Sequence, residues 1–331
     1  MHLPRFTYHR LSSRSEAARL LKECGSRARL VAGGTDLYPR LKYGLLHPEV
    51  IVSLKDVAVK NPEVDESGNL HIDPLMTLAA VVRSDIIGEK YPLLAAAAFK
   101  VASNQIRNVA TLGGNICLEN RCLYYNQSHT YQFVEACLKR GGNHCDFFPR
   151  GKKCFAVFVA DTVTALLSLD AIITFTDGEN IRCLPLEQLY TGDALRPLDL
   201  NEGDILTEVV IPAQHALCGT AFEKFSLRGG LEFGALNFAA VLKIAADNQT
   251  CLEARLTAGA ISQAPVRLAK AEAALQAQRL TSSLWKDVAR IAAAEAAPVP
   301  HHGYSGAYLK EALEVHVRRA LERAFASALT Q

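Results

Sequence analysis

The sequence lacks the features that mark several common classes of protein. Its 331 residues carry a formal net charge of only +2, so it has no strongly basic character of the kind that nucleic-acid-binding domains use. The first eight residues lack the apolar core of a secretory signal, and Asp161 and Asp170 interrupt the most apolar stretch, residues 155–175. There is no HExxH motif and no Ser-His-Asp series. We therefore expect a cytoplasmic protein without a hydrolytic site and without a nucleic acid or membrane partner.

What is present is an ordinary globular composition in a long chain. Hydrophobic residues make up 49% and charged residues 21% of the sequence, which disfavours disorder. Single cores usually stop growing at about 250 to 300 residues, so 331 residues predict at least two domains. In a reducing compartment the nine cysteines are better suited to metal binding or catalysis than to disulfides.

Local patterns predict alternating helices and strands. Ser13-Arg14-Ser15-Glu16 has the form of a capping box for a helix that reaches Cys24, and Gly25 is a plausible stop. Thr77 predicts the start of another helix. Further helices are expected at residues 93–102, 161–169 and from about 306, and strands at residues 28–32, 49–54, 70–73, 171–176, 221–226, 238–244 and 251–257.

Two glycine pairs predict a binding site for a diphosphate. Glycine lets the backbone approach a ligand closely and direct successive N–H groups at one anion. Each pair could instead form a tight turn without a ligand. Neither is a GxGxxG or Walker loop, so the pairs alone identify no nucleotide. The candidate residues are Ala32, Gly33, Gly34, Thr35 and Asp36 in the first segment and Thr111, Gly113, Gly114 and Asn115 in the second.

Four cysteines that follow the second pair predict a metal centre. Cys122, Cys137, Cys145 and Cys154 lie within a segment that shows no clear helix or strand period. Four thiolates suit either tetrahedral zinc or an iron–sulfur cluster. The wide intervals fit neither the paired CxxC of a zinc ribbon nor the compact run of a bacterial ferredoxin. The alternative is that they are ordinary buried cysteines, and Cys117 is better explained as a packed residue or a neighbour of a cofactor.

The glycine segments also resemble the two diphosphate-binding motifs of a known family. Residues 30–37 and 111–116 are similar to those of the FAD subunit of molybdenum hydroxylases, the xanthine dehydrogenase and carbon monoxide dehydrogenase family. The likeness extends to residues 106–110, 222–228 and 259–267, and covers nearly the whole chain except residues 118–155. It implies an α+β architecture: the two-part FAD-binding fold of the vanillyl alcohol oxidase (PCMH) type, and a C-terminal α/β domain with a small antiparallel sheet and helices.

The resemblance implies a division of the chain and roles for several residues. Residues 1–55 and 56–217 would form the two FAD-binding parts, with 118–155 as an inserted cysteine-rich loop, and residues 218–331 the C-terminal domain. Both glycine segments would hold the FAD diphosphate, and Asp161 would approach the ribose. Lys224 and Arg228 would lie near the flavin or close the site. A helix N-cap is the alternative role for Asp161. No catalytic residue is expected, because a molybdenum-cofactor subunit would carry the substrate chemistry and another subunit the [2Fe–2S] clusters.

The inserted loop resembles one in the beta subunits of the 4-hydroxybenzoyl-CoA reductases, a branch of this family. Residues 122–128 look like its opening. The resemblance implies a [4Fe–4S] cluster on Cys122, Cys137, Cys145 and Cys154. Electrons would then flow inward from a ferredoxin-like donor through this cluster and FAD, for reductive dehydroxylation of 4-hydroxybenzoyl-CoA. One alternative is a hydroxylase FAD subunit that passes electrons outward to NAD or a quinone. Another is a zinc-stapled binding or scaffold module without flavin.

The second half of the loop is basic. It contains Lys139, Arg140, Arg150, Lys152 and Lys153. Such a patch would offset the charge of a four-thiolate cluster and dock an acidic donor. A solvated charged loop without a partner is the alternative.

Overall fold

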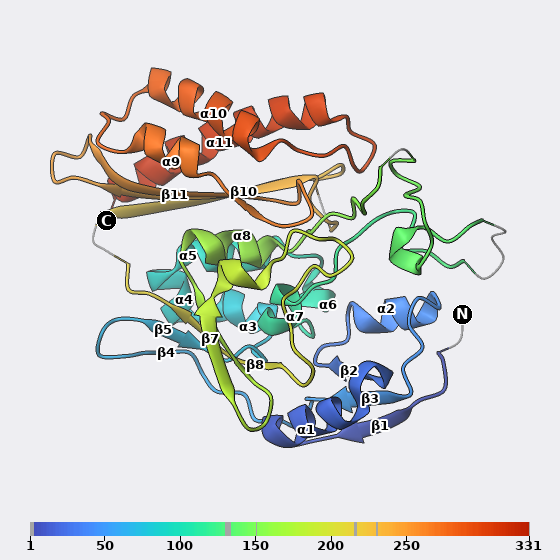
Figure 1. Cartoon of the computed structure of the whole chain (residues 1–331). Coiled ribbons are helices and arrows are strands. Elements are labelled where there is room, and N and C mark those ends of the chain that lie inside the picture. The colour runs from blue at the N-terminus through green and yellow to red at the C-terminus, as the bar shows by residue number, and fades with distance from the viewer. Residues whose placement is uncertain (1–2, 130–133, 150, 215–216, 230, 331) are drawn as a thin grey trace.

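Three β-sheets organise the protein, whose structure is a computed structural model that describes residues 3–129, 134–149, 151–214, 217–229 and 231–330. The sheets follow one another along the chain, and Figure 1 shows the C-terminal sheet and its helices above the N-terminal parts. In the described residues no helix combines the length and the apolar character needed to cross a bilayer. The predicted α+β class with a small antiparallel C-terminal sheet is confirmed.

The first sheet has three parallel strands in the order β1-β3-β2. Helix α1 begins after Ser13, whose hydroxyl accepts a hydrogen bond from the Glu16 N–H at 3.4 Å, and ends at Gly25, where φ is 52°. This is the predicted cap and stop. The elements of this part are β1 (Thr7–Arg10), α1 (Arg14–Cys24), β2 (Ala28–Val31), α2 (Leu37–Lys42) and β3 (Val50–Ser53).

The second sheet has five antiparallel strands in the order β4-β5-β8-β6-β7. Helices α3, α5 and α8 pack together over it, and the Thr77 hydroxyl caps α3 as predicted, accepting from the Ala80 N–H at 3.2 Å. The strands are β4 (Glu63–Val64), β5 (Leu70–Ile72), β6 (Ile172–Thr176), β7 (Ile181–Pro185) and β8 (Ile205–Ile211). The helices are α3 (Leu78–Arg83), α4 (Asp85–Lys90), α5 (Pro92–Phe99), α6 (Asn104–Arg107), α7 (Leu112–Ile116) and α8 (Asp161–Ser168).

The third sheet is antiparallel, in the order β12-β11-β10-β9, and lies between two layers of helices. Helices α10 and α11 cover one face, and α8 packs against the other (Figure 1). Because both faces are covered, β10 reads as an almost continuous apolar run instead of an alternating one. The elements are β9 (Cys218–Phe225), β10 (Leu236–Ile244), β11 (Cys251–Gly259), β12 (Val266–Arg267), α9 (Ala269–Leu275), α10 (Ser282–Ala296) and α11 (Gly306–Ala328).

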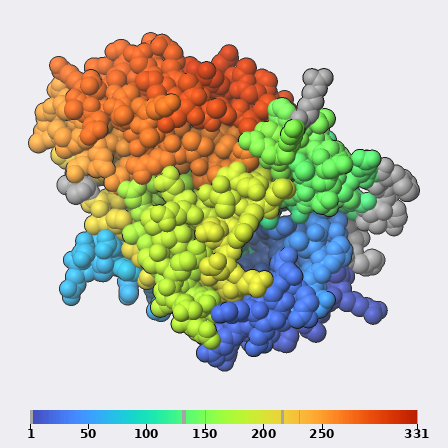
Figure 2. Space-filling model, viewed as in Figure 1, coloured from blue at the N-terminus to red at the C-terminus, as the bar shows by residue number. Residues whose placement is uncertain are grey.

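The segment that contains the four predicted metal ligands lies at the side of the molecule. Figure 2 shows its green atoms between the blue N-terminal region and the orange C-terminal region. Arg121 exchanges two backbone hydrogen bonds with Val157, both 2.8 Å, which ties the start of the segment to its end. The Asn120 amide donates to the Gln263 carbonyl at 2.8 Å and so links the segment to the C-terminal part. Its described regular structure is a short 3₁₀ turn, Leu138–Arg140.

Candidate functional site

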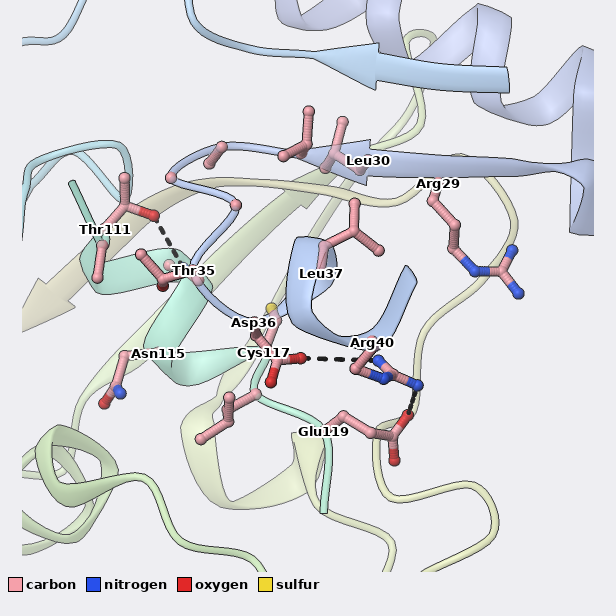
Figure 3. A pocket seen from close by; sticks show the side chains of 18 of the residues that line it. Arg29, Leu30, Thr35, Asp36, Leu37, Arg40, Thr111, Asn115, Cys117 and Glu119 are labelled. Carbon is pink, nitrogen blue, oxygen red and sulfur yellow. Dashed lines mark hydrogen bonds and ion pairs between the residues drawn. The ribbon is translucent and has the colours of Figure 1, made fainter. Parts of the chain in front are cut away.

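The two glycine segments line one large cavity. Its volume is about 720 Å³, within the range of small-molecule and cofactor sites. Residues 29–37 from the end of β2 and the start of α2 form one wall, and residues 110, 111 and 113–115 form another, as Figure 3 shows for the labelled side chains. All nine residues predicted to hold a diphosphate are brought to this cavity or its edge: Ala32, Gly33, Gly34, Thr35, Asp36, Thr111, Gly113, Gly114 and Asn115.

The first glycine pair has no room for side chains. A Cβ atom on Gly33 would lie 2.1 Å from the carbonyl oxygen of Val109, directly before the second segment. Gly34 has a φ of +70°, and a Cβ there would lie 2.5 Å from the ring of Tyr38. The two segments therefore approach each other backbone to backbone, which requires glycine.

The second glycine pair is the beginning of a helix, not the turn that its sequence suggested. Thr111 caps α7, and its hydroxyl oxygen accepts a hydrogen bond from the Gly114 N–H at 3.1 Å. A Cβ atom on Gly113 would lie 2.8 Å from Pro74. The Asn115 side-chain oxygen accepts from the Thr162 hydroxyl at 2.6 Å, which fixes the end of α7 against α8. Glycine here allows close packing of α7 as well as access to the cavity.

Three arginines reach the cavity wall: Arg29, Arg40 and Arg121. The Asp36 carboxylate is shared between Arg121 and Arg40, and the Arg40 contact measures 3.7 Å. Burial lowers the pKa of Arg121, and burial together with the charge of Arg40 lowers the pKa of Arg29. Crowded, partly desolvated guanidinium groups suit an anionic ligand.

Asp161 and Lys224 form a buried ion pair beside a second cavity of about 490 Å³. Their contact is 2.6 Å, and each side chain is only 4% exposed. The Asn237 amide donates to the other carboxylate oxygen at 2.8 Å, and the Lys224 ammonium also donates to the Lys100 carbonyl at 2.8 Å. Burial raises the pKa of the Asp161 carboxyl, while the charge and hydrogen bond of Lys224 oppose that rise. Asp161 is the first residue of α8 and its side chain does not cap the helix.

The second cavity adjoins the first. Both are lined by Val101, Ala102, Asn115 and Phe233. The structure therefore brings the residues expected near the ribose and the flavin close to the glycine segments, but it pairs the two charges with each other.

The four clustered cysteines share one small cavity. Cys137, Cys145 and Cys154 are buried, Cys122 is half-buried, and all four line a space of about 10 Å³. The Phe148 N–H donates to the Cys145 sulfur at 3.4 Å. Burial raises the pKa of Cys122, and the backbone N–H groups of Tyr125 and Tyr124 act in the opposite direction. Burial also raises the pKa of Cys154, and the backbone N–H group of Ala156 opposes that rise.

Cys117 belongs to a different environment. It lines the first cavity, on the segment that leads to Glu119 (Figure 3). Burial raises its pKa to about 12, so its thiol stays protonated at neutral pH and is a poor metal ligand.

Comparison with known families assigns almost the whole chain. Residues 4–214 match the FAD binding domain in molybdopterin dehydrogenase, which is more than half of the sequence. The chain belongs to this family. Residues 220–324 match the CO dehydrogenase flavoprotein C-terminal domain. The protein is thus an FAD-binding oxidoreductase subunit of the xanthine dehydrogenase and CO dehydrogenase type.

Individual relatives cover the full length of this FAD-binding subunit. It is 26% identical over 326 residues to the putative xanthine dehydrogenase FAD-binding subunit of Escherichia coli (strain K12), with 97% of each chain covered. It is 25% identical over 323 residues to the carbon monoxide dehydrogenase medium chain of Afipia carboxidovorans, with 98% of each covered. In structure it is similar to a chain of the CO dehydrogenase of Hydrogenophaga pseudoflava, with a TM-score of 0.82, 24% identity and 99% of both chains covered. The last likeness confirms the predicted fold.

The residues around the first cavity fit FAD. The cavity is large enough for a dinucleotide to enter, the glycines of two segments meet where side chains would clash, and arginines lie at its wall. Sequence reasoning missed Arg40, Glu119 and Arg121. Only their positions in the sequence could have indicated two of them: Arg40 follows Asp36 by one helical turn, and Arg121 directly precedes Cys122.

The cysteine cavity has the type of donor atoms that an iron–sulfur cluster needs, but it is too small to hold one. Within the described residues, no three His, Cys, Asp or Glu side chains converge closely enough to hold a metal ion. A space of about 10 Å³ holds about one water molecule. Four thiols with backbone N–H groups directed at three of them are nevertheless the type of donor that iron–sulfur clusters use.

Proposed function

We propose that this FAD-binding subunit transfers electrons within a molybdenum hydroxylase-family complex and carries a second redox centre on Cys122, Cys137, Cys145 and Cys154. Its partners would be a molybdenum-cofactor subunit and a [2Fe–2S] subunit. Electrons would enter from an external donor such as a ferredoxin, and the complex would remove the phenolic hydroxyl of 4-hydroxybenzoyl-CoA reductively. The observation that carries the proposal is that four cysteines, separated by up to 32 positions in sequence, line one cavity.

The FAD part of the proposal assigns roles to the cavity residues. Backbone N–H groups of Gly33–Asp36 would bind the diphosphate, and residues 111–115, most of whose N–H groups donate within the protein, would line its other side. Arg40 or Arg121 would balance its charge. Asp161 and Lys224 would order the region beside the flavin through their mutual ion pair. When bound, FAD supplies reversible electron uptake. The surrounding apolar side chains, among them Leu206 and Phe233, would limit the access of water.

The cysteine part of the proposal rests on donors and on charge. Backbone N–H groups directed at the sulfurs stabilise thiolates, and the Lys139 ammonium lies at the same cavity. An iron–sulfur cluster supplies one-electron transfer at a potential that such charges and hydrogen bonds set. Zinc is less well supported, because a single ion needs its ligands to converge more closely than these do.

The proposed assembly is supported by the names of similar proteins, and the proposed substrate is supported by the resemblance of the cysteine loop. The names of similar proteins describe an FAD-binding subunit, a medium chain and a subunit of the 6-hydroxypseudooxynicotine dehydrogenase complex. These names support a subunit role for the present chain. The opening of the loop at residues 122–128 supports the 4-hydroxybenzoyl-CoA reductase branch.

The proposal of an acidic electron donor depends on the basic residues of the cysteine loop. Lys152 and Lys153 are exposed, whereas the Lys139 ammonium is buried against Glu119, and Arg150 lies outside the described residues. Lys139 therefore belongs to the interior, not to a docking surface. The remaining charges support an acidic donor less strongly than the sequence alone suggested.

Metal and flavin analysis of anaerobically purified protein tests the proposal. We expect about four iron and four sulfide per FAD. The variant Cys145→Ser should lose the iron and keep the FAD, whereas Cys183→Ser, at an exposed position outside the cavity, should keep both. FAD without iron would leave an ordinary hydroxylase flavin subunit that passes electrons outward to NAD or a quinone. Zinc without FAD would refute the redox function.

A further inference from the structure

Arg121 connects three segments of the chain at the wall of the first cavity. It lies in the cysteine loop, residues 118–155, and its guanidinium contacts two residues outside that loop. One is Asp36, which lies 85 positions earlier in the first glycine segment, and the other is Phe233 in the C-terminal part. All three side chains line the first cavity, so a residue of the cysteine loop belongs to the cavity that fits FAD.

Backbone contacts fix the position of Arg121. Its N–H and its carbonyl both bond with Val157 at 2.8 Å. The preceding Asn120 is fully buried, and its side-chain amide donates to the carbonyls of Ala156 at 2.9 Å and Gln263 at 2.8 Å. None of these bonds involves a cysteine sulfur. The guanidinium of Arg121 therefore extends from a base that the rest of the protein holds in place.

The Asp36 carboxylate is held by arginines and has no part in capping a helix. Asp36 precedes α2, its backbone is already helical, and its side chain makes no capping hydrogen bond. One carboxylate oxygen accepts from Arg121, and the other faces Arg40 at 3.7 Å. The three side chains are between 13% and 23% exposed, so solvent screens these contacts less than surface ones. Asp36 ends the first glycine segment, and the arginines therefore fix the position of that end (Figure 3).

The cysteine loop also holds the second of these arginines. Glu119, near the start of the loop, accepts from Arg40 at 3.5 Å through one oxygen and from Lys139 at 2.8 Å through the other. The side chain of Lys139 is only 6% exposed, so Glu119 is itself held from the interior. Both contacts of the Asp36 carboxylate thus depend on residues of the cysteine loop.

Phe233 is the second partner of Arg121. The guanidinium carbon lies 4.9 Å from the centroid of the Phe233 ring, within the range of a cation–π contact. Phe233 lines the second cavity as well as the first. Arg121 therefore also holds an aromatic side chain at the junction of the two cavities.

We propose that the cysteine loop is a structural part of the FAD site, independently of what its four cysteines bind, and that Arg121 is the positioning residue through which it acts. Arg121 would fix the first glycine segment through Asp36 and the junction of the cavities through Phe233. The inference rests on the FAD part of the proposed function. Without the Arg121 guanidinium, Asp36 keeps only its longer contact with Arg40, and the glycine segment loses its fixed end.

Titration of the full-length apoprotein with FAD, followed by flavin fluorescence in the presence of a metal chelator, tests the inference. Arg121→Gln should raise the FAD dissociation constant roughly 3- to 30-fold, the effect typical of residues that act on a site through others. Arg121→Lys should recover only part of the affinity, because an ammonium cannot reach Asp36 and cover the Phe233 ring at once. The matched control is Arg290→Gln on α10, an exposed arginine paired with Asp287, which should bind FAD like the wild type.

A double variant tests whether Arg121 acts through Asp36. Arg121→Gln combined with Asp36→Asn should weaken FAD binding no more than the weaker of the two single variants, since both remove the same contact. Additive losses would overturn the positioning role, because Arg121 would then act on FAD independently of Asp36. Urea unfolding identifies variants that have lost their fold, and Arg121→Lys decides the question if Arg121→Gln is among them.

Two results separate this inference from the assignment of the glycine segment. Wild-type affinity in Arg121→Gln, together with weakened binding in Gly33→Ala, would overturn the role of the loop and leave the diphosphate site in place. Wild-type affinity in both variants would overturn the loop's role and the diphosphate site together. An equal loss in Arg290→Gln would also overturn the inference, because the effect would not be specific to Arg121.

Discussion

Alanine at Gly33 tests the close approach of the two glycine segments. Its Cβ atom would lie 2.1 Å from the Val109 carbonyl oxygen, whereas ordinary contact begins at 3.4 Å, so the backbones must separate by about 1.3 Å. Gly33 does not have a left-handed φ, so alanine adds no backbone strain and the effect is steric. Overpacking of this kind costs about 1–3 kcal/mol of unfolding free energy.

The same substitution should also weaken FAD binding. If this segment binds the diphosphate as proposed, a displacement of this size would remove at least one backbone hydrogen bond to it, and a hydrogen bond to a charged group contributes about 1.5–3 kcal/mol. The dissociation constant of FAD should therefore rise roughly 10- to 160-fold, since 1.4 kcal/mol corresponds to about tenfold. Fluorescence titration with FAD measures the affinity, and urea unfolding of the apoprotein measures the stability.

The matched control is alanine at Gly88, which lies within α4. A Cβ atom there would meet nothing within 4 Å, and its φ is not left-handed. Gly88→Ala should leave FAD affinity unchanged and stabilise the helix by up to about 1 kcal/mol. An FAD dissociation constant for Gly33→Ala within twofold of the wild type would refute the assignment of this segment to the diphosphate.

Two further predictions concern charges. Asp161→Asn leaves Lys224 buried without its partner and should lower the free energy of unfolding, measured in urea, by about 3–5 kcal/mol. The double variant with Lys224→Met should recover much of this loss. Equal losses in both variants would contradict a dominant charge effect. A hydrogen bond to Glu208, and a weaker effect of the one to Asp65, raise the pKa of His71. The contribution of His71 to stability is therefore fully present below its unfolded pKa of about 6.5 and is lost as the pH rises through the raised folded pKa. The stability difference between wild type and His71→Asn should shrink from pH 6 to pH 8, and a constant difference would argue against this linkage.

Local sequence signals predicted most of the elements correctly. The capping residues Ser13 and Thr77 start α1 and α3, and the apolar spacing of the last helix places Leu309, Leu313 and Val317 in the core. These signals act over one or two turns, so their effect does not depend on the rest of the chain. The exception is Gly113-Gly114, which looked like a turn but begins α7, because the Thr111 cap and tight packing against Pro74 favour a helix there.

The predicted site residues line the cavities of the structure, but their contacts with one another were not predicted. The sequence by itself determined the donor types: two glycine segments suited to a diphosphate, four cysteines suited to a metal centre, and the α+β architecture that the family comparison confirms. Only the tertiary structure decided that Gly33 lies against Val109, that Asp161 is paired with Lys224, and that Glu119 contacts both Arg40 and Lys139. The sequence specifies residue type and local spacing directly. The pairing of distant charges depends on how sheets and loops pack, and no short sequence pattern encodes that packing.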